Sequence, residues 1–255
     1  MSWDPQLYLK FSDHRARPAL DLLARVPLDA PRLAVDLGCG AGNVTRAIAA
    51  RWPQATVWGV DSSKAMLVKA AQAPSRIRWI EADVGKWNPR KEPDLIYSNA
   101  TLHWILDHDV LFPRLFGALN AGGCLAVQMP RNWNAPSHRL MREALDDLKL
   151  GSAGLKRYVG RVWVEDPHFY YDLLAPRAKS LDVWETEYQH VLEGDDPVLE
   201  WVRSTGLRPI LEELNPKEKA AYLEEYAGRL RKAYPKRTDG RTLYPFRRLF
   251  IVALA

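Results

Sequence analysis

The 255-residue sequence contains few cysteines and no long apolar segment. Its only cysteines are Cys39 and Cys124, and no CxxC or Cys/His spacing predicts a metal site. So few thiols in a chain of this length favour a reducing compartment over a disulfide-stabilised fold. The first residues lack the pattern of a signal peptide, and no apolar run approaches the roughly 20 residues that span a membrane. We therefore expect a cytoplasmic protein without a metal or a membrane partner.

The sequence also lacks a dense basic block or an arginine-rich tail. Lysine and arginine total 36 against 31 acidic residues, which gives a formal net charge of +5 at pH 7. A small positive excess favours anionic partners, either nucleic acid or a small acidic substrate, but it is equally typical of an ordinary solvated surface. Because the positive charges are dispersed, we expect no nucleic-acid partner. Hydrophobic residues make up 47% of the chain, so it can bury a substantial core without disulfides.

Short apolar runs alternate with amphipathic segments through the first half of the chain. The run at residues 32–37 ends in glycines, as a buried strand does before a turn, and the segment 43–51 has helical spacing. This βαβ rhythm predicts an α/β fold with a mainly parallel sheet and helices on both faces. Ligands of such sheets bind beyond the carboxyl ends of the strands. The other elements expected here are strands at 56–60, 77–81, 94–98 and 124–129 and helices at 18–26, 63–72 and 111–119.

The second half of the chain is more polar and more helical. The glycines between residues 151 and 160 predict a mobile loop. Helical spacing recurs over residues 196–234, with breaks at Gly206 and Pro216. The other elements expected here are helices at 132–149 and 169–175 and strands at 183–191 and 249–254.

We expect a single domain over residues 1–255. An N-terminal lid is expected at 1–17, and helical insertions at about 131–168 and 195–240. The second insertion would lie between the last two strands and could cap the rim of the sheet.

The stretch VDLGCGAGN, residues 35–43, places glycines between a predicted strand and a predicted helix. Glycines allow a tight turn and a close approach of a ligand to the backbone. An NAD-dependent oxidoreductase has a similar turn, with the spacing GxGxxG. Here Gly38, Gly40 and Gly42 follow GxGxG instead, so the spacing argues against a dinucleotide.

Three aspartates accompany this loop. A carboxylate at Asp36, just before the glycines, could order the turn and bind an ammonium group, whereas a pyrophosphate gains nothing from an anion there. Asp61 follows the second predicted strand and Asp83 the third, and carboxylates suit the hydroxyl and amine donors of an adenosine ligand. The alternatives are structural: Asp36 could only order the loop, Asp61 could cap a helix and Asp83 could be an exposed polar residue.

The motifs VDLGCGAGN, WGVDSS, EADV and DLIYSNATLHWI resemble, in order and spacing, those of the class I S-adenosylmethionine-dependent methyltransferases. The resemblance implies a Rossmann-like, seven-stranded, mainly parallel sheet whose last strand, RRLFIVALA, is antiparallel. It also implies S-adenosyl-L-methionine as cofactor, S-adenosyl-L-homocysteine as product and no metal. The donor-site residues that it implies are Gly38 and Gly40 at the methionine part, Asp61 at the ribose, Ser62 and Met66 beside the adenine, Asp83 and Val84 at the adenine edge, and Asn99 near the sulfonium.

Longer segments resemble one branch of that family, the trans-aconitate methyltransferases. These segments are WDPQLYLKFSDHRARPALDLLARVPL, NATLHW, LAVQMPRNW, WVRSTGLRP and FRRLFIVA, and they are spread over essentially the whole chain. The resemblance implies transfer of a methyl group to one carboxylate of a small anionic tricarboxylate, trans-aconitate. A methyltransferase for another small or carrier-bound carboxylic acid is an alternative, as is a non-catalytic module that binds the donor.

Such an acceptor needs no general base, because a carboxylic acid with a pKa of roughly 4 is ionised at neutral pH. The protein must align the reacting atoms, exclude water and pair the remaining carboxylates, for which the arginine fork is suited. We expect His103 and Trp104 to position the acceptor, although His103 could be a core histidine. The candidate substrate-binding residues are Arg131, Arg203 and Arg208, each of which could also be a solvated surface arginine, and Tyr8 and His14 in the lid. Arg208 is the favoured residue of this group.

Overall fold

The computed structural model describes residues 12–89, 91–203 and 205–255, with the backbone alone for residues 12–15. The chain forms two compact units. The first, here called the sheet unit, contains Arg15–Pro130, Trp163–Thr186 and Arg248–Ala255. Of the described residues, the second, the helical unit, contains Ser12–His14, Arg131–Val162 and Glu187–Arg247. The expectation that all of this is one domain with a lid and two insertions remains a prediction.

The sheet has seven strands in the order β3-β2-β1-β4-β5-β7-β6. The first five strands pair in parallel, and β7 pairs with β5 in the antiparallel direction. Strand β1 is buried at every position, as a central parallel strand requires. This confirms the expected seven-stranded, mainly parallel sheet with a reversed last strand. The strands are β1 (Leu33–Leu37), β2 (Thr56–Asp61), β3 (Arg78–Glu81), β4 (Leu95–Asn99), β5 (Cys124–Pro130), β6 (Ser180–Leu192) and β7 (Thr242–Leu254).

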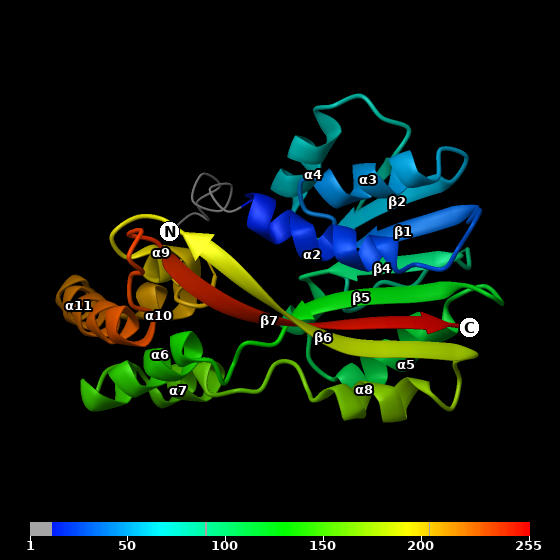
Figure 1. The fold of residues 1–255 in the computed structure, drawn as a ribbon. Helices are drawn as coiled ribbons and strands as arrows, with labels where there is room; N and C mark the ends of the chain where they lie inside the picture. Colours follow the sequence, from blue (N-terminus) through cyan, green and yellow to red (C-terminus); the bar gives the residue numbers. More distant parts are fainter. Residues whose placement is uncertain (1–11, 90, 204) are drawn as a thin grey trace. The chain divides into compact units, whose positions relative to one another are not determined.

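Helices cover both faces of the sheet in the sheet unit (Figure 1). On one face, Tyr97 of β4 donates a buried hydrogen bond of 2.6 Å from its hydroxyl to Ala19 O of α2. On the other face, α5 and α8 pack together, and His108 Nδ1 lies 2.7 Å from the Tyr170 hydroxyl. The helices of this unit are α2 (Ser12–Ala24), α3 (Asn43–Arg51), α4 (Lys64–Ala71), the short 3₁₀ helix η1 (Leu102–Trp104), α5 (His108–Gly117) and α8 (Pro167–Leu174).

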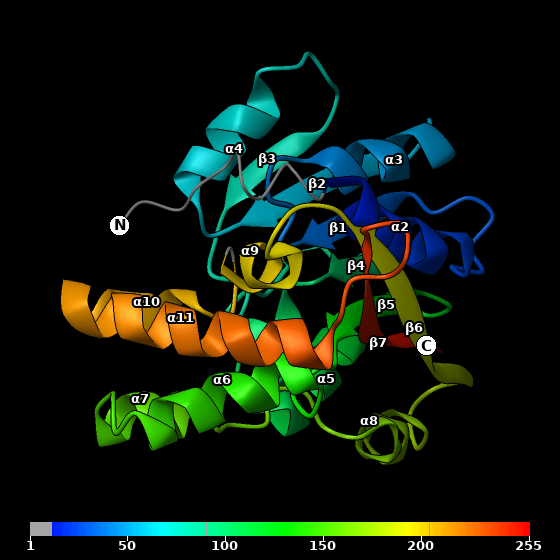
Figure 2. The same ribbon diagram turned by 60° about the vertical axis from the view of Figure 1, so that its left-hand side comes forward.

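The helical unit has its own core, built on tyrosines. Helices α6 and α11 lie side by side in both ribbon views (Figures 1 and 2). Buried Tyr222 and Tyr226 of α11 donate hydrogen bonds to Met141 O and Ser137 O of α6, at 3.1 and 2.6 Å. These bonds satisfy hydroxyls that would otherwise be costly to bury. The helices of this unit are α6 (Pro136–Asp147), α7 (Ala153–Val159), α9 (Pro197–Arg203), α10 (Arg208–Glu213) and α11 (Pro216–Ala233).

The prediction of a mobile loop at residues 151–160 is wrong, because this segment contains helix α7. Ser152 caps the helix by accepting a hydrogen bond of 3.1 Å from Leu155 N on its side-chain oxygen. Leu155 is buried in the core of the helical unit. Two of the three glycines lie outside the helix, at its ends, where glycine is common.

The last strand is longer than expected, since β7 begins at Thr242 and not at residue 249. Pro245 and two arginines obscured it, because proline and charge both disfavour a central strand. In the structure, buried and more exposed side chains alternate along this part of β7. Thr242, Tyr244 and Phe246 are buried, and the residues between them are more exposed.

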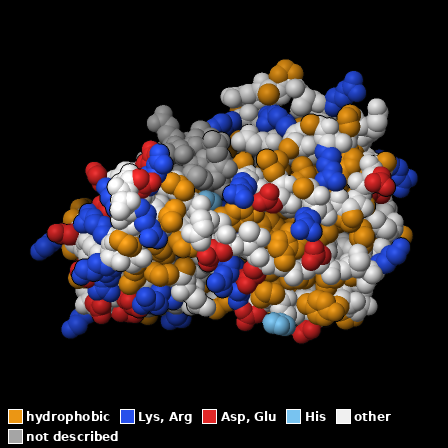
Figure 3. Space-filling model, viewed as in Figure 1, with side chains coloured by type: hydrophobic (Ala, Val, Ile, Leu, Met, Phe, Trp, Pro, Cys, Tyr) orange, Lys and Arg blue, Asp and Glu red, His pale blue; other side chains and the backbone are white. Residues whose placement is uncertain are grey.

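On the face shown in Figure 3, lysine and arginine side chains are mixed with aspartate and glutamate outside the grey atoms. Among the described residues, no helix is both long enough and apolar enough to cross a membrane. Those residues also contain no group of three or more histidine, cysteine or carboxylate side chains that could hold a metal ion.

Candidate active site

The glycine loop after β1 is held tightly against two neighbouring strands. The backbone N–H groups of Gly38 and Cys39 both donate to Val60 O of β2, at 2.7 and 3.1 Å. Gly38 has a φ of +78°, and a Cβ built there would lie 2.0 Å from Thr101 Oγ1, beyond the end of β4. Only glycine combines a positive φ without strain with the absence of a Cβ. Ser98 Oγ adds a hydrogen bond of 2.8 Å to Leu37 O, so the ends of β1, β2 and β4 form one rim.

Asp61, at the end of β2, joins this loop to the next one. Its Oδ2 accepts a hydrogen bond of 2.8 Å from Gly40 N, and its Oδ1 accepts one of 2.8 Å from Ser63 N. The cap of helix α4 is Ser63, whose side chain accepts from Met66 N, so Asp61 is not the helix cap. Each carboxylate oxygen can accept a further hydrogen bond. Within the described part of the chain, a Cβ at Gly40 would meet no heavy atom within 4 Å apart from those of its chain neighbours, so these residues leave the loop open on this side.

Asp36 lies beneath the loop and is 2% exposed. Burial raises its pKa to about 7; a hydrogen bond from Thr45 opposes the increase, and the negative charge of Asp61 adds to it. Thr45 Oγ1 of α3 donates that bond to Asp36 Oδ2 at 2.6 Å. This bond joins the end of β1 to the first turn of α3. A cation bound nearby would favour its ionised form.

Trp79 of β3 packs between two glycines of the rim. A Cβ at Gly42 would lie 2.4 Å from its Cη2, and a Cβ at Gly59 would lie 2.5 Å from its Cε3. The guanidinium of Arg46 lies 5.6 Å from the centre of the same indole ring. The loop is thus shaped by an aromatic side chain as well as by hydrogen bonds.

Beyond β3, the structure places Asp83 and Val84 in adjacent but different environments. Asp83 is exposed, and its Oδ1 accepts a hydrogen bond of 2.9 Å from Gly85 N. Val84 is 6% exposed. Beyond β2, Ser62 is exposed and Met66 is half-buried. These four residues follow the carboxyl ends of β2 and β3, where the sequence placed them.

The segment after β4 carries the expected acceptor residues. His103 is buried, and burial together with the positive charge of Arg248 and the nearby His108 lowers its pKa to about 3. It is therefore a neutral imidazole. The next residue, Trp104, is 49% exposed, and the two ring centres lie 4.6 Å apart. Among the described residues, no partner is present for the buried Oδ1 of Asn99 or for Nδ1 of His103.

The expected substrate arginines all belong to the helical unit. Arg131 is half-buried and Arg203 is exposed at the end of α9. Arg208 is exposed at the start of α10, and its Nε donates a hydrogen bond of 2.8 Å to Glu212 Oε1. Tyr8 lies outside the described residues, and so does the side chain of His14.

Sequence reasoning missed Arg248, a buried arginine of the sheet unit that is 4% exposed. Its Nη1 donates a hydrogen bond of 3.5 Å to Gln128 Oε1 of β5, also fully buried. The alternation that places Arg248 inward becomes visible only once the strand is known to begin at Thr242. Arg248 continues the buried alternation of Thr242, Tyr244 and Phe246, and so falls on the inward phase of β7.

Comparisons with known proteins identify the family. A family model described as a methyltransferase domain matches residues 34–123. The trans-aconitate 2-methyltransferases of Methylobacterium radiotolerans and of Azoarcus sp. are each 50% identical to this chain. The first alignment covers 98% of this chain and 97% of the relative, and the second covers 99% of each. The chain belongs to the trans-aconitate 2-methyltransferase family.

The fold of this methyltransferase is also similar to that of phosphoethanolamine N-methyltransferase 2 from Haemonchus contortus. That structure contains phosphomonomethylethanolamine and S-adenosylhomocysteine. The TM-score is 0.56 at 17% identity, over 93% of this chain and 52% of the other. Similarity at this level concerns the fold alone, and it agrees with the mainly parallel sheet described above.

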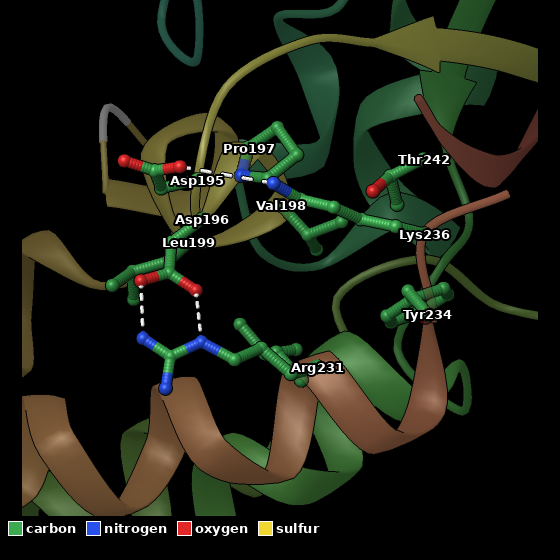
Figure 4. A pocket seen from close by; sticks show the side chains of 10 residues that line it. Asp195, Asp196, Pro197, Val198, Leu199, Arg231, Tyr234, Lys236 and Thr242 are labelled. Atoms are coloured by element: carbon green, nitrogen blue, oxygen red, sulfur yellow. Dashed lines mark hydrogen bonds and ion pairs between the residues drawn. The ribbon is translucent and has the colours of Figure 1, made fainter. Parts of the chain in front are cut away.

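The methyltransferase has a pocket of about 340 Å³ within the helical unit (Figure 4). Its charged side chains neutralise one another. Asp196 accepts two hydrogen bonds from Arg231, at 2.7 and 2.6 Å, and Lys236 lies 3.7 Å from Asp195. An anion would have to displace these carboxylates, so the pocket is a poor site for a polycarboxylic acid.

The buried carboxyl of Asp36 predicts a pH-dependent stability. Its pKa of about 7 in the folded state is above the usual value, so the folded state retains a proton that the unfolded chain releases between about pH 4 and 7. The contribution of Asp36 to stability should therefore fall as pH rises through this window and level off above it, whereas buried His103 and His138, with pKa values lowered to about 3 and about 4, act in the opposite direction in wild type and variant alike. Asp36→Asn removes this contribution. The difference in unfolding free energy between wild type and Asp36→Asn should therefore change by roughly 2–4 kcal/mol between pH 4 and pH 8. Urea denaturation from pH 4 to 8 measures the difference.

The exposed carboxylate of Asp172, on α8, provides the control. Asp172→Asn should keep the wild-type pH profile. Parallel profiles for wild type and Asp36→Asn would contradict the assignment.

Proposed function

We propose that this protein transfers the methyl group of S-adenosylmethionine to one carboxylate of trans-aconitate, giving the monomethyl ester and S-adenosylhomocysteine. The observation that carries the proposal is 50% identity to two trans-aconitate 2-methyltransferases over nearly the full length of each chain. Family membership removes the oxidoreductase alternative. A methyltransferase for another carboxylic acid is still an alternative, because one family can accept different acids.

The rim of the sheet unit fits the methyl donor. Two observations support this fit: the open side of the loop at Gly40, and the unpartnered Asn99 Oδ1 among the described residues. A partially negative amide oxygen suits a cation, and the spare lone pairs of Asp61 suit the ribose hydroxyls. The proposed donor residues are Asp36, Gly38 and Gly40 at the methionine part, Asp61 at the ribose, Ser62, Met66, Asp83 and Val84 around the adenine, and Asn99 near the sulfonium.

S-adenosylmethionine supplies an electrophilic methyl group on a positively charged sulfonium. The acceptor carboxylate is already ionised at neutral pH, so no residue of the chain has to remove a proton. Neutral, buried His103 fits this scheme, since with a pKa of about 3 it carries no charge at neutral pH. We assign positioning of the acceptor to His103 and exclusion of water to Trp104.

The function is tested by incubating the protein with S-adenosylmethionine and a panel of di- and tricarboxylic acids. Trans-aconitate should stimulate S-adenosylhomocysteine formation most strongly, and mass spectrometry should detect its monomethyl ester. Faster turnover of a different acid would assign that acid instead. An absence of turnover with every acid, together with tight donor binding, would favour a non-catalytic module.

The role of Asp61 is tested by Asp61→Asn, which keeps the size of the side chain. The variant loses the negative charge and places an amide beside backbone N–H donors. We expect the affinity for S-adenosylhomocysteine, measured by calorimetry, to fall roughly 10–100-fold, because hydrogen bonds to charged groups contribute more than neutral ones. Glu81→Gln is the control, since Glu81 is exposed and pairs with Asp61 in the sheet register. Affinities within twofold of each other would refute the role.

Arg208 is the proposed substrate-binding arginine of the helical unit, with Arg131 and Arg203 as further candidates. We expect Arg208→Ala to raise the KM for trans-aconitate roughly tenfold or more, because one charge-assisted hydrogen bond is lost, and to leave donor affinity unchanged. The control is Arg139→Ala, because Arg139 makes the same type of ion pair with Glu143 and its side chain is 51% exposed against 52% for Arg208. Steady-state kinetics would contradict the role if both variants had the same KM.

A further inference from the structure

Four polar side chains share one face of the sheet near the carboxyl ends of its strands. In the register, Asp36 is opposite Tyr97, and Asn99 is opposite Gln128. Gln128 is in turn opposite Phe250 of the antiparallel strand β7. Because side chains alternate along a strand, Asp36, Asn99, Gln128 and Arg248 all project from this face.

The polarity of these side chains changes across the face. Asp36 and Asp61, at the ends of β1 and β2, are carboxylates, and Asn99 of β4 presents an amide oxygen. On β7, Arg248 carries a buried positive charge. Gln128, between them, turns its Oε1 toward the guanidinium, at 3.5 Å from Nη1. Its Nε2 is then left as a donor of two hydrogen bonds.

Three buried polar atoms in this region lack hydrogen-bond partners within the described part of the chain: Asn99 Oδ1, Gln128 Nε2 and His103 Nδ1. Buried polar atoms are nearly always paired, so three orphans in one region indicate that a ligand supplies the partners. Asn99 Oδ1 requires a donor or a cation. Gln128 Nε2 requires an acceptor. His103 Nδ1 can donate to the same acceptor when the single N–H of the neutral imidazole is on Nδ1.

We propose that Arg248, Gln128 and His103 form the subsite that holds a carboxylate of the acceptor acid. Arg248 provides the positive charge, and Gln128 and His103 provide neutral donors beside it. Asn99 lies at the boundary with the donor side. The carboxylates on β1 and β2 thus lie on the side proposed for the sulfonium, and Arg248 on β7 lies on the side proposed for the acceptor carboxylate. The two reacting groups would meet between them. This inference rests on the proposed function, because the anion it assigns to the subsite is the acceptor.

The test compares Arg248→Gln, Gln128→Glu and the neighbouring control Arg247→Gln. Arg247 is exposed and lies 3.9 Å from Glu187. Calorimetry measures the binding of trans-aconitate to the protein saturated with S-adenosylhomocysteine, and separately the binding of S-adenosylhomocysteine alone. Steady-state kinetics gives kcat and KM. Gln128→Glu is isosteric, and its new carboxylate would pair with Arg248, so this variant should fold even if Arg248→Gln does not.

We expect both site variants to bind trans-aconitate roughly 10–100-fold more weakly and to show a matching rise in KM, because a charge-assisted contact is lost or opposed. Binding of S-adenosylhomocysteine should stay within twofold, and Arg247→Gln should match the wild type. Wild-type acid affinity in Gln128→Glu would overturn the subsite. An equal loss of acid and S-adenosylhomocysteine binding would also overturn it, because Arg248 would then belong to the donor site.

Failure of the proposed function gives a different result. If the wild type binds and methylates another acid of the panel, that acid replaces trans-aconitate, and the same variants still decide the role of Arg248. If the wild type binds no acid at all, both the function and the subsite are refuted.

Discussion

The carboxylate of Asp61 is the interaction on which the rim of the sheet depends. It accepts one backbone hydrogen bond from Gly40 and another from Ser63, so a single side chain fixes the loop after β1 and the start of α4 together. With both backbone donors satisfied, the same carboxylate still has lone pairs for a ligand. Under the proposed function, one carboxylate would therefore serve both structural order and ligand binding.

Methyl transfer to a carboxylate brings together a positive sulfonium and a negative acceptor. The sheet unit has side chains of opposite charge at two places along one edge. Its carboxyl groups, Asp36 and Asp61, lie near the ends of β1 and β2, and its buried guanidinium, that of Arg248, lies on β7. The sheet order separates these strands by β4 and β5. A parallel arrangement with a reversed last strand thus places groups of opposite charge at the same edge, although they are far apart in sequence.

Local patterns were sufficient to predict the strands at whose ends the proposed donor residues lie. Gly38 directly follows the buried strand β1, Asp61 is the last residue of β2, and Asp83 comes two residues after β3. Arg248 could not be recognised in the same way, because burial of a charge depends on neighbours from β5 and η1 that local sequence does not reveal. Helix α7 was missed because its flanking glycines resemble a loop, whereas the helix is stabilised by packing of its buried Leu155 into a core formed by residues outside the segment.

Trp79 has a consequence for how this sequence can change over time. Its indole occupies the space that a side chain would need at both Gly42 and Gly59. A larger residue at Gly59 requires a smaller one at 79, whereas Gly42 also has a φ of +79° and lies close to Arg46, so a smaller residue at 79 would not relieve the restriction there. Positions 59 and 79 should therefore evolve as a linked pair, and redesign of the adjacent rim would have to begin with the indole.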